Sequence, residues 1–289
     1  MKIIVFGGSG FLGSHVADVL SANGHNVIIF DIKKSPYLKK DQKMIIGDIS
    51  NSKEVDSAVK GVDYVYNFAG LADLDTATTK PIDTINTNIL GNINILEASR
   101  KAKVKRFIYA STIYVYSHKG GFYRCSKQAS ELYIEEYQKK YGLEYTILRY
   151  GSLYGPRANE ANGVYRMLRT ALETKSIKTV GRGDELREYI NVKDAAQLSV
   201  DILNADYANK HMIITGHYPM KYEDMLFMIK EILNDNIKIQ FDGVNLDHYN
   251  YTPYSFIPKI GQKLISNQYT DMGQGLLECL HEIQTEINK

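Results

Sequence analysis

The chain has little of several features that mark specialised classes of protein. Only two of its 289 residues are cysteines, Cys125 and Cys279, and their wide separation favours reduced thiols over a disulfide framework. The 35 Lys and Arg residues nearly balance the 33 Asp and Glu residues, and no basic block is long enough to follow a nucleic acid. The seven His and two Cys residues show no metal-ligand spacing. We therefore expect no disulfide, no nucleic-acid partner and no metal site.

Long apolar segments are also missing. The longest apolar runs have the length of strands, and the chain enters its first expected strand at once, so we expect no signal peptide, membrane span or membrane partner. With 44% hydrophobic and 24% charged residues, the chain can bury a full core in one large or two interleaved domains. The composition indicates a soluble globular protein, for which the cytoplasm is the expected location.

A glycine-rich loop follows the first expected strand. The run Lys2-Ile-Ile-Val-Phe6 is apolar and β-branched, as in a buried parallel strand. Apolar residues then take helical spacing from Phe11 to Leu20, so Gly7-Gly-Ser-Gly10-Phe-Leu-Gly13 joins a strand to a helix. In such a loop the first glycine permits a tight turn, the second lets backbone N–H groups approach a pyrophosphate, and the third lets helix and strand pack closely. The alternative is a glycine turn that binds nothing.

An acidic residue ends the next expected strand, Asn26-Val-Ile-Ile-Phe-Asp31. Asp31 lies 18 residues beyond Gly13, close to the spacing of a carboxylate that hydrogen-bonds a ribose 2′-hydroxyl. The same carboxylate would repel a 2′-phosphate, which favours NAD over NADP. Lys33 and Lys34 weaken that preference, because either ammonium could attract a phosphate.

A second motif, Tyr123-Arg-Cys-Ser-Lys127, follows Thr112, which ends a further expected strand. Residues four apart share one face of a helix, so the Lys127 ammonium is expected beside the Tyr123 phenol. A free tyrosine has a pKa of about 10, and a neighbouring positive charge lowers that pKa toward neutrality. Such a phenol can exchange a proton with an alcohol while the Thr112 hydroxyl holds the reacting oxygen. The alternative is an exposed Tyr–Lys pair on an amphipathic helix, and Cys125 between them is interpreted as a bystander.

Strands and helices are expected to alternate along the first half of the chain, with a long amphipathic helix at 82–102. This alternation predicts an α/β fold built on a doubly wound parallel Rossmann sheet, with ligands at the carboxyl ends of the strands. Further strand-like runs lie at 43–48, 62–69, 106–112 and 145–149.

The second half of the chain contains more loops and helices. We expect an NAD-binding Rossmann domain at 1–155 and a smaller, interleaved substrate-binding part at 156–289. Strand-like segments near 187–216 are expected to return to the main domain.

Together these motifs resemble the extended short-chain dehydrogenases/reductases of the nucleotide-sugar epimerase and dehydratase family, and the resemblance covers nearly the whole chain. Besides the glycine loop and the Tyr123 to Lys127 motif, it rests on Gly47-Asp-Ile49, Phe68-Ala-Gly-Leu71, Asn88-Ile-Leu-Gly91, Ser111-Thr-Ile-Tyr-Val-Tyr116, Leu148-Arg-Tyr-Gly-Ser-Leu-Tyr-Gly-Pro156 and Arg187-Glu-Tyr-Ile-Asn-Val-Lys-Asp194.

The resemblance implies three groups of functional residues. The implied catalytic residues are Thr112, Tyr123 and Lys127. The implied substrate-binding residues are Ser111, Thr112, Ser152 and Arg187. Arg187 would bind a diphosphate through its planar guanidinium, and the alternative is a structural salt bridge with Asp184 or Glu188. The implied NAD-binding residues are Gly7, Gly10, Phe11, Leu12, Gly13, Asp31, Ile32, Lys33, Asp48, Ile49, Phe68, Ala69, Gly70, Leu71, Asn88, Tyr123 and Lys127.

Several positions depart from the family pattern. The 4,6-dehydratases of the family carry an Asp-Glu pair directly after the catalytic threonine, where this chain has Ile113 and Tyr114. Neither side chain can supply the extra acid and base that removal of water requires, so dehydration is not expected. The stretch before Tyr123 is shorter than in typical family epimerases, which implies a more open sugar site. Ser152 replaces a usual asparagine and Gly151 a bulky residue, which changes the substrate contacts that the family pattern implies.

The family resemblance predicts NAD-dependent oxidation at C4 of a nucleotide-diphospho-sugar, a hexose or heptose, by a 4-dehydrogenase or 4-epimerase of surface polysaccharide biosynthesis. The segment His248-Tyr-Asn-Tyr-Thr-Pro-Tyr-Ser-Phe256 and the short stretch before Tyr123 are similar to those of nucleotide-heptose 4-dehydrogenases of capsule biosynthesis. The alternatives are a nucleotide-sugar keto-reductase and a non-catalytic NAD-binding sensor or scaffold. Members of that last kind commonly lose the tyrosine or the lysine, and this chain has both. The family habit also predicts a homodimer formed by the helix at 82–102 and the helix that carries Tyr123.

Overall fold

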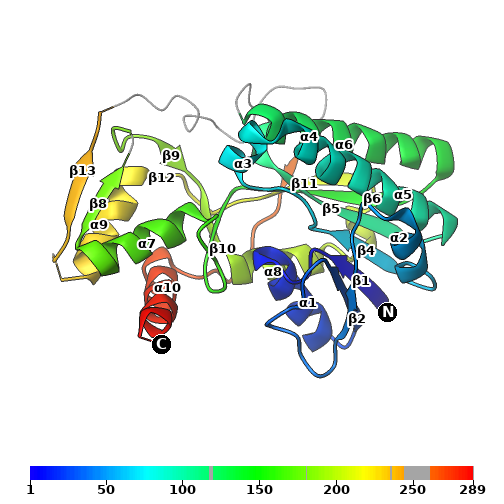
Figure 1. The fold of residues 1–289 in the computed structure, drawn as a ribbon, viewed down its shortest axis with the longest axis horizontal. Helices are drawn as coiled ribbons and strands as arrows, with labels where there is room; N and C mark the ends of the chain where they lie inside the picture. Colours follow the sequence, from blue (N-terminus) through cyan, green and yellow to red (C-terminus); the bar gives the residue numbers. More distant parts are fainter. Residues whose placement is uncertain (117–119, 180, 235, 244–260, 289) are drawn as a thin grey trace. The chain divides into compact units, whose positions relative to one another are not determined.

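The computed structural model describes residues 1–116, 120–179, 181–234, 236–243 and 261–288. It divides into two compact units, each made of segments that are separate in the sequence (Figure 1). Unit 1 contains the described parts of Met1–Tyr150, Ala196–Ile213 and Tyr254–Lys263, and unit 2 contains those of Gly151–Ala195, Ile214–Pro253 and Leu264–Lys289.

Unit 1 is built on an eight-stranded sheet with the strand order β14-β11-β6-β5-β4-β1-β2-β3. Neighbouring strands pair in parallel from β3 through β1 to β6. The strand order reverses between β1 and β4, and in open α/β sheets ligands bind at the carboxyl ends of the strands at such a point. The strands are β1 (Lys2–Phe6), β2 (Asn26–Asp31), β3 (Lys43–Ile46), β4 (Tyr64–Asn67), β5 (Arg106–Thr112), β6 (Glu144–Tyr150), β11 (Lys210–Ile214) and β14 (Gln262–Lys263).

Helices cover both faces of this sheet (Figure 1). On one face lie α2 (Ser52–Ala58), α5 (Asn92–Lys101) and α6 (Gly121–Tyr141), whose apolar side chains share a buried core with the central strands. On the other face lie α1 (Phe11–Ala22) and α8 (Val192–Asp201), where the Ser199 carbonyl accepts a hydrogen bond from the Tyr66 hydroxyl of β4 at 2.9 Å. The predicted fold class, an α/β fold with a doubly wound parallel sheet, is confirmed.

Glycines define both ends of α6, the helix that carries Tyr123. Gly120 and Gly121 have φ of 95° and 51° where the helix begins, and Gly142 has φ of 71° where it ends. These positive φ values are open to glycine at no steric cost, so the chain can turn sharply at each end of the helix. Lys139 and Lys140 lie in the last turn, where cations interact favourably with the helix dipole.

The helix predicted at 82–102 is present but is not uniform. It consists of α4 (Pro81–Thr84), a π-helical stretch (Ile85–Gly91) and α5, and it follows the short helix α3 (Leu74–Thr79). Pro81 begins α4, because a proline suits the first helical position. π-helical turns are rare and frequently lie at functional sites. This one carries Asn88, whose contacts are described with the site.

Unit 2 is mainly helical. Its helices α7 (Gly163–Thr174), α9 (Tyr222–Ile232) and α10 (Met272–Ile287) enclose a separate core. The side chains of Asn162 and Asp271 cap α7 and α10 by accepting hydrogen bonds from the first turn of each helix. The described part of this unit also holds the two-stranded pairs β10 (Tyr189–Asn191) with β7 (Ser152–Tyr154), β12 (Met220–Lys221) with β9 (Leu186–Arg187), and β13 (Lys238–Phe241) with β8 (Ser176–Thr179).

The strand-like segment at 187–192 does not join the main sheet, which corrects the expectation from the sequence. Its residues form β9 and β10, and Tyr189 pairs with Ser152 within unit 2. By contrast, β11 is a strand of the eight-stranded sheet. Apolar β-branched residues predict that a segment is extended, but they do not determine which strand it pairs with.

None of the described helices combines the length and the apolar character needed to cross a membrane.

Candidate active site

The glycine loop between β1 and α1 adopts a conformation that requires its glycines. Gly7 has a φ of +74°, and a Cβ on it would lie 2.6 Å from the backbone nitrogen of Ala69, just after β4. A Cβ on Gly13 would overlap the carbonyl oxygen of Gly7. The loop, the start of α1 and the segment after β4 therefore approach one another at backbone distance, in the crevice where the strand order reverses. In Rossmann folds this crevice binds the pyrophosphate of a dinucleotide.

Asp31 is held beside this loop at the end of β2. Its Oδ2 accepts a hydrogen bond from the Ser9 backbone N–H at 3.0 Å, and its Oδ1 accepts one from the Lys33 N–H at 3.1 Å. The Ser9 hydroxyl donates to the Lys33 carbonyl at 2.9 Å. Next to Asp31, the apolar side chain of Ile32 is 62% exposed. The carboxylate is thus fixed at the carboxyl edge of the sheet, and contacts of Asp31, Ile32 and Lys33 with a ribose or base stay predictions.

Asp48 and Ile49, two of the predicted NAD-binding residues, have different surroundings. Asp48 is exposed, and its Oδ1 accepts a hydrogen bond from the Ser50 N–H at 2.8 Å. Ile49 is buried, and a Cβ on Gly91 would lie 2.6 Å from its Cδ1. The Ile49 side chain therefore packs against the π-helical stretch, while the Asp48 carboxylate is accessible to a ligand.

Asn88 connects the segment after β4 to α6. Its Oδ1 accepts a hydrogen bond from the Leu71 N–H at 2.7 Å, and its Nδ2 donates to the Leu71 carbonyl and to the Ser126 hydroxyl, both at 3.0 Å. A Cβ on Gly70 would lie 2.8 Å from the Asn88 Oδ1, so this segment also needs a glycine. Both donors of the amide are used within the protein. Asn88 therefore holds the Phe68 to Leu71 segment, which is predicted to line the cofactor.

The structure brings Thr112, Tyr123 and Lys127 together at the carboxyl end of β5. All three residues are buried, and the two on α6 lie one helical turn apart. The Thr112 hydroxyl lies close enough to the Tyr123 phenol to act on its pKa. The Lys127 ammonium donates to the Ala110 carbonyl at 2.7 Å and lies 5.7 Å from the centre of the Tyr123 ring. The three groups named from the sequence thus form one cluster.

Burial is the largest influence on the pKa values of Tyr123 and Lys127. Desolvation raises the pKa of Tyr123 to about 12, against the lowering effect of the nearby Thr112 hydroxyl. Desolvation also lowers the pKa of Lys127 to about 8, against the raising effect of Glu131. The argument from spacing, in which Lys127 lowers the pKa of Tyr123, is wrong for the chain alone. The Lys127 ammonium donates its hydrogen bond to the Ala110 carbonyl and not to the phenol oxygen. The cost of burying a phenolate is therefore the largest influence on the pKa of Tyr123.

Ser152 and Arg187, two of the predicted substrate residues, lie in unit 2. The Ser152 backbone N–H donates to the Glu188 carbonyl at 3.2 Å, and the Arg187 guanidinium lies 4.4 Å from the centre of the Tyr222 ring. This cation–π contact orients the guanidinium. The substrate roles of both residues stay predictions.

Two buried groups close to the cluster were not identified from the sequence. Glu131 accepts a hydrogen bond from the Ser111 hydroxyl at 2.5 Å, so this hydroxyl is engaged within the protein. The Tyr109 ring centre lies 4.7 Å from the Lys127 ammonium. The sequence holds one signal for Glu131, because a residue four positions after Lys127 lies on the same helical face. Tyr109 has no such signal, since an aromatic residue in a buried strand is common.

Among the residues that the structure describes, no group of three or more His, Cys, Asp or Glu side chains is placed to hold a metal ion. Cys125 is exposed on α6 and Cys279 is buried. The segment 248–256 and the residues 117–119 before Tyr123, which suggested a heptose enzyme, lie outside the described residues.

Comparison with known proteins identifies the family. The model of the NAD dependent epimerase/dehydratase family matches residues 3–215. The chain belongs to this family. The resemblance stated from the motifs is confirmed, and so is NAD as the cofactor of the family.

Relatives within the family differ in their reactions. A Methanocaldococcus jannaschii protein with the provisional name UDP-glucose 4-epimerase is 31% identical over 224 residues, 70% of this chain and 73% of the relative. A UDP-N-acetyl-alpha-D-glucosaminuronate decarboxylase of Bacillus cytotoxicus is 28% identical, covering 94% of this chain and 89% of the relative. The Bacillus cereus UDP-glucuronic acid 4-epimerase, solved with UDP-glucuronic acid and NAD, has the same fold, with a TM-score of 0.86 at 23% identity over 99% of this chain and 100% of that one. Family membership therefore supports an enzyme that acts on a nucleotide sugar and leaves its reaction open.

Proposed function

We propose that the protein uses NAD to oxidise C4 of a nucleotide-diphospho-sugar, as a 4-dehydrogenase or a 4-epimerase. One observation carries this proposal. The Tyr123 phenol is buried near Thr112, the last residue of β5, and lies one helical turn from Lys127, in the unit that contains the glycine loop. A phenol, a hydroxyl and an ammonium at one point suit proton exchange with a sugar hydroxyl.

The described residues of unit 1 fit the cofactor of the family. The Gly7 to Gly13 loop would hold the pyrophosphate at the start of α1, Asp31 would bind the adenosine ribose, and the Phe68 to Leu71 segment would line the middle of the dinucleotide. When bound, NAD would carry a positive charge on its oxidised nicotinamide ring, and this ring would accept the hydride from the substrate carbon. Gly7 and Gly13, which leave no room for a Cβ, support this assignment.

In the proposed mechanism the residues of this chain handle the proton. Tyr123 removes it from the sugar hydroxyl, and Thr112 donates a hydrogen bond to the same oxygen. Because burial raises the pKa of Tyr123 to about 12, the phenolate needs added positive charge. The Lys127 ammonium and the oxidised nicotinamide ring are the proposed sources of that charge.

A keto-reductase is the second candidate, and one observation favours it. With a pKa of about 12 the Tyr123 phenol is protonated at neutral pH, which is the form that donates a proton to a ketone oxygen during reduction. Dehydration is not proposed. Ile113 and Tyr114, the first residues of the 3₁₀ turn Ile113–Tyr116, provide neither the acid nor the base that elimination needs.

The remaining parts of the proposal rest on the family resemblance. Unit 1 is proposed as the NAD-binding domain and unit 2 as the substrate-binding part, with Ser152 near the sugar and Arg187 on the diphosphate. A homodimer is proposed through the helix at 82–102, which comprises α4, the π-helical stretch and α5, and through α6. The proposed setting is the cytoplasmic synthesis of a surface polysaccharide, with a capsule heptose or hexose as the sugar.

The decisive experiment incubates the purified protein with a panel of UDP-, GDP- and dTDP-sugars and identifies the products by mass spectrometry and NMR. A 4-keto product or a C4 epimer, absent with Tyr123→Phe, is expected. The same panel with 4-keto sugars and NADH tests the reductase. Tight NAD binding without any product would contradict the enzyme and favour the sensor or scaffold.

A further inference from the structure

A buried charged cluster lies on the far side of Lys127 from Tyr123. On α6 the residues Tyr123, Lys127, Glu131 and Glu135 follow at intervals of four, so they share one face of the helix. Glu131 is 5% exposed. A carboxylate is rarely buried to this extent unless it is paired, so its partners indicate what it does.

The partners of Glu131 come from the two strands nearest the site. Its Oε1 accepts hydrogen bonds from the Ser111 hydroxyl at 2.5 Å and from the Arg149 Nε at 3.0 Å, and its Oε2 accepts one from the Arg149 Nη2 at 2.7 Å. Ser111 and Arg149 are register partners across β5 and β6. Ser111 immediately precedes Thr112. One carboxylate thus ties the end of β5, and the strand beside it, to the Lys127 face of α6.

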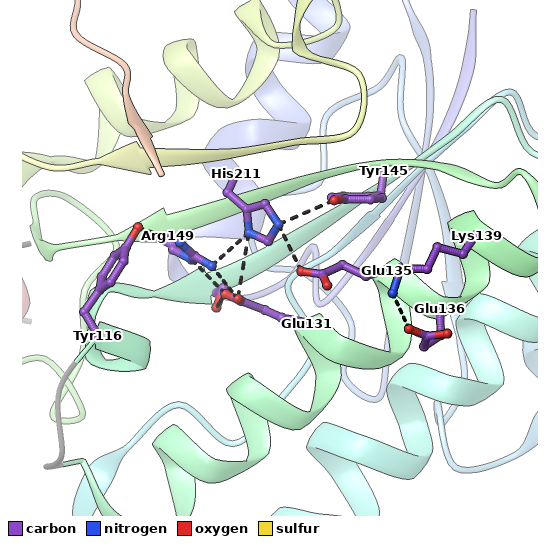
Figure 2. Close-up of polar contacts among 9 residues, drawn as sticks. Tyr116, Glu131, Glu135, Glu136, Lys139, Tyr145, Arg149 and His211 are labelled. Atoms are coloured by element: carbon purple, nitrogen blue, oxygen red, sulfur yellow. Dashed lines mark hydrogen bonds and ion pairs between the residues drawn. The ribbon is translucent and has the colours of Figure 1, made fainter. Parts of the chain in front are cut away.

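Arg149 is itself fully enclosed. It is 1% exposed, and besides Glu131 it donates to the Tyr116 hydroxyl at 2.5 Å and to the His211 Nδ1 at 2.9 Å (Figure 2). A guanidinium can only donate, so the His211 Nδ1 is the acceptor and the ring proton is on Nε2. That nitrogen faces a Glu135 oxygen at 3.2 Å. His211 is therefore neutral in this arrangement, and the Arg149 charge is balanced by Glu131.

We propose that Glu131 is a positioning residue of the active site. Its carboxylate fixes the Thr112 end of β5 against α6 and supports the positive charge of Lys127. This inference rests on the proposed function, in which the Lys127 ammonium helps to bind the cofactor and to stabilise the phenolate. Glu131 itself contacts neither substrate nor cofactor, because its oxygens are engaged by Ser111 and Arg149.

The surroundings of Lys127 explain why it needs a nearby carboxylate. Its ammonium faces the rings of Tyr109 from β5 and Tyr123 from α6, and it bonds the Ala110 carbonyl. These neutral groups replace water only in part. Burial accordingly lowers the pKa of Lys127, and Glu131 is the group that opposes this change.

The test measures NADH affinity by fluorescence from about pH 6 to about pH 10, the range in which the lysine titrates. In the wild type, affinity is expected to fall as pH rises through about 8, where Lys127 loses its proton. In Glu131→Gln the fall is expected about 1 pH unit lower, because an opposing charge is removed. Glu135→Gln is the matched control, since it neutralises a carboxylate two turns from Lys127 on the same face, and it is expected to match the wild type.

Turnover on the sugar identified with the panel gives the second readout. Glu131→Gln is expected to lower kcat about 10- to 100-fold with KM little changed, because the reacting groups are displaced. An unshifted pH limb in folded Glu131→Gln would overturn the inference while leaving the proposed function intact. A wild type without any alkaline limb would overturn both the role of Lys127 and this inference.

Glu131→Gln leaves the buried Arg149 without its counter-ion, so this variant is first checked for folding by circular dichroism. If it does not fold, Ser111→Ala is the variant that tests the inference. This change deletes the hydroxyl that ties β5 to Glu131 and keeps the charge pair. A fall in kcat at constant KM, with the alkaline limb unmoved, is expected. An unchanged kcat, or a change in KM alone as for a substrate contact, would overturn the inference.

Discussion

At the scale of single residues, the proposed chemistry depends on Tyr123. Tyr123→Phe keeps the ring and its packing but removes the group that exchanges the proton. The rate should fall about 10²- to 10⁴-fold, the usual contribution of a general acid or base. NADH and nucleotide-sugar affinity should change little, and titration calorimetry checks both. An unaltered rate with substrate shown to be bound would disprove the mechanism.

Lys127 illustrates a cost to stability at a functional position. Burial lowers its pKa to about 8. At neutral pH the Lys127 ammonium is therefore less stable in the folded chain than in the unfolded chain, and this difference lowers the free energy of unfolding. Lys127→Met should therefore raise the free energy of unfolding at pH 7 by about 1 to 3 kcal/mol while abolishing activity.

The sign of the pH effect gives an internal control for this variant. Between about pH 8 and the usual lysine pKa of about 10.4, the unfolded wild type binds more protons than the folded one, so wild-type stability rises with pH. The advantage of Lys127→Met should shrink over that range. Denaturant unfolding at both ends of it is the measurement, and an advantage that does not vary with pH would contradict the assigned cause.

Asp31 should determine the choice of cofactor. Its carboxylate is fixed by the N–H groups of Ser9 and Lys33 at the end of β2. We expect tighter binding of NADH than of NADPH, and Asp31→Ser should narrow or reverse the difference because the repulsion of a 2′-phosphate is lost. Fluorescence titration with both cofactors is the measurement. Tighter NADPH binding by the wild type would show that Lys33 and Lys34 outweigh Asp31.

At the scale of elements, the contact between the glycine loop and α1 decides whether the cofactor crevice can form. A Cβ on Gly13 would overlap the Gly7 carbonyl, so Gly13→Ala must displace the start of α1. We expect a loss of about 1 to 3 kcal/mol in stability, as for overpacking elsewhere, and a clear loss of NADH affinity. Gly163→Ala is the control, because a Cβ there meets nothing within 4 Å at the start of α7. Equal behaviour of the two variants would contradict this account of the loop.

At the scale of the whole molecule, exposed apolar side chains on unit 1 support a homodimer. Ile82 of α4 is 65% exposed, Leu90 of the π-helical stretch 50%, and Phe122 and Leu132 of α6 50% and 55%. These residues lie on elements that pack against one another, and large exposed apolar side chains commonly belong to protein interfaces. Leu132→Glu should give a monomer in light scattering, while Leu277→Glu, on α10 of unit 2 and 48% exposed, should remain a dimer. A monomeric wild type at working concentration would rule the dimer out.

The sequence by itself determined the parts of this protein that depend on local order. β1, the glycine loop, α1 and Asp31 follow one another along the chain, and strand and helix periodicity locate each of them. The spacing of Tyr123 and Lys127 likewise places both on one helical face, and Thr112 ends the strand before them.

The tertiary structure decided the properties that depend on residues distant in the sequence, namely burial, side-chain pairing and strand pairing. Whether a residue is buried is a property of the whole fold, so burial, and not the four-residue spacing, sets the pKa of Tyr123. The pairing of Glu131 with Arg149 and Ser111 joins three elements, and no local pattern contains it. The same holds for the partner of β10 and for the π-helical stretch around Asn88, because pairing and side-chain bonding between distant segments are settled only when the segments meet.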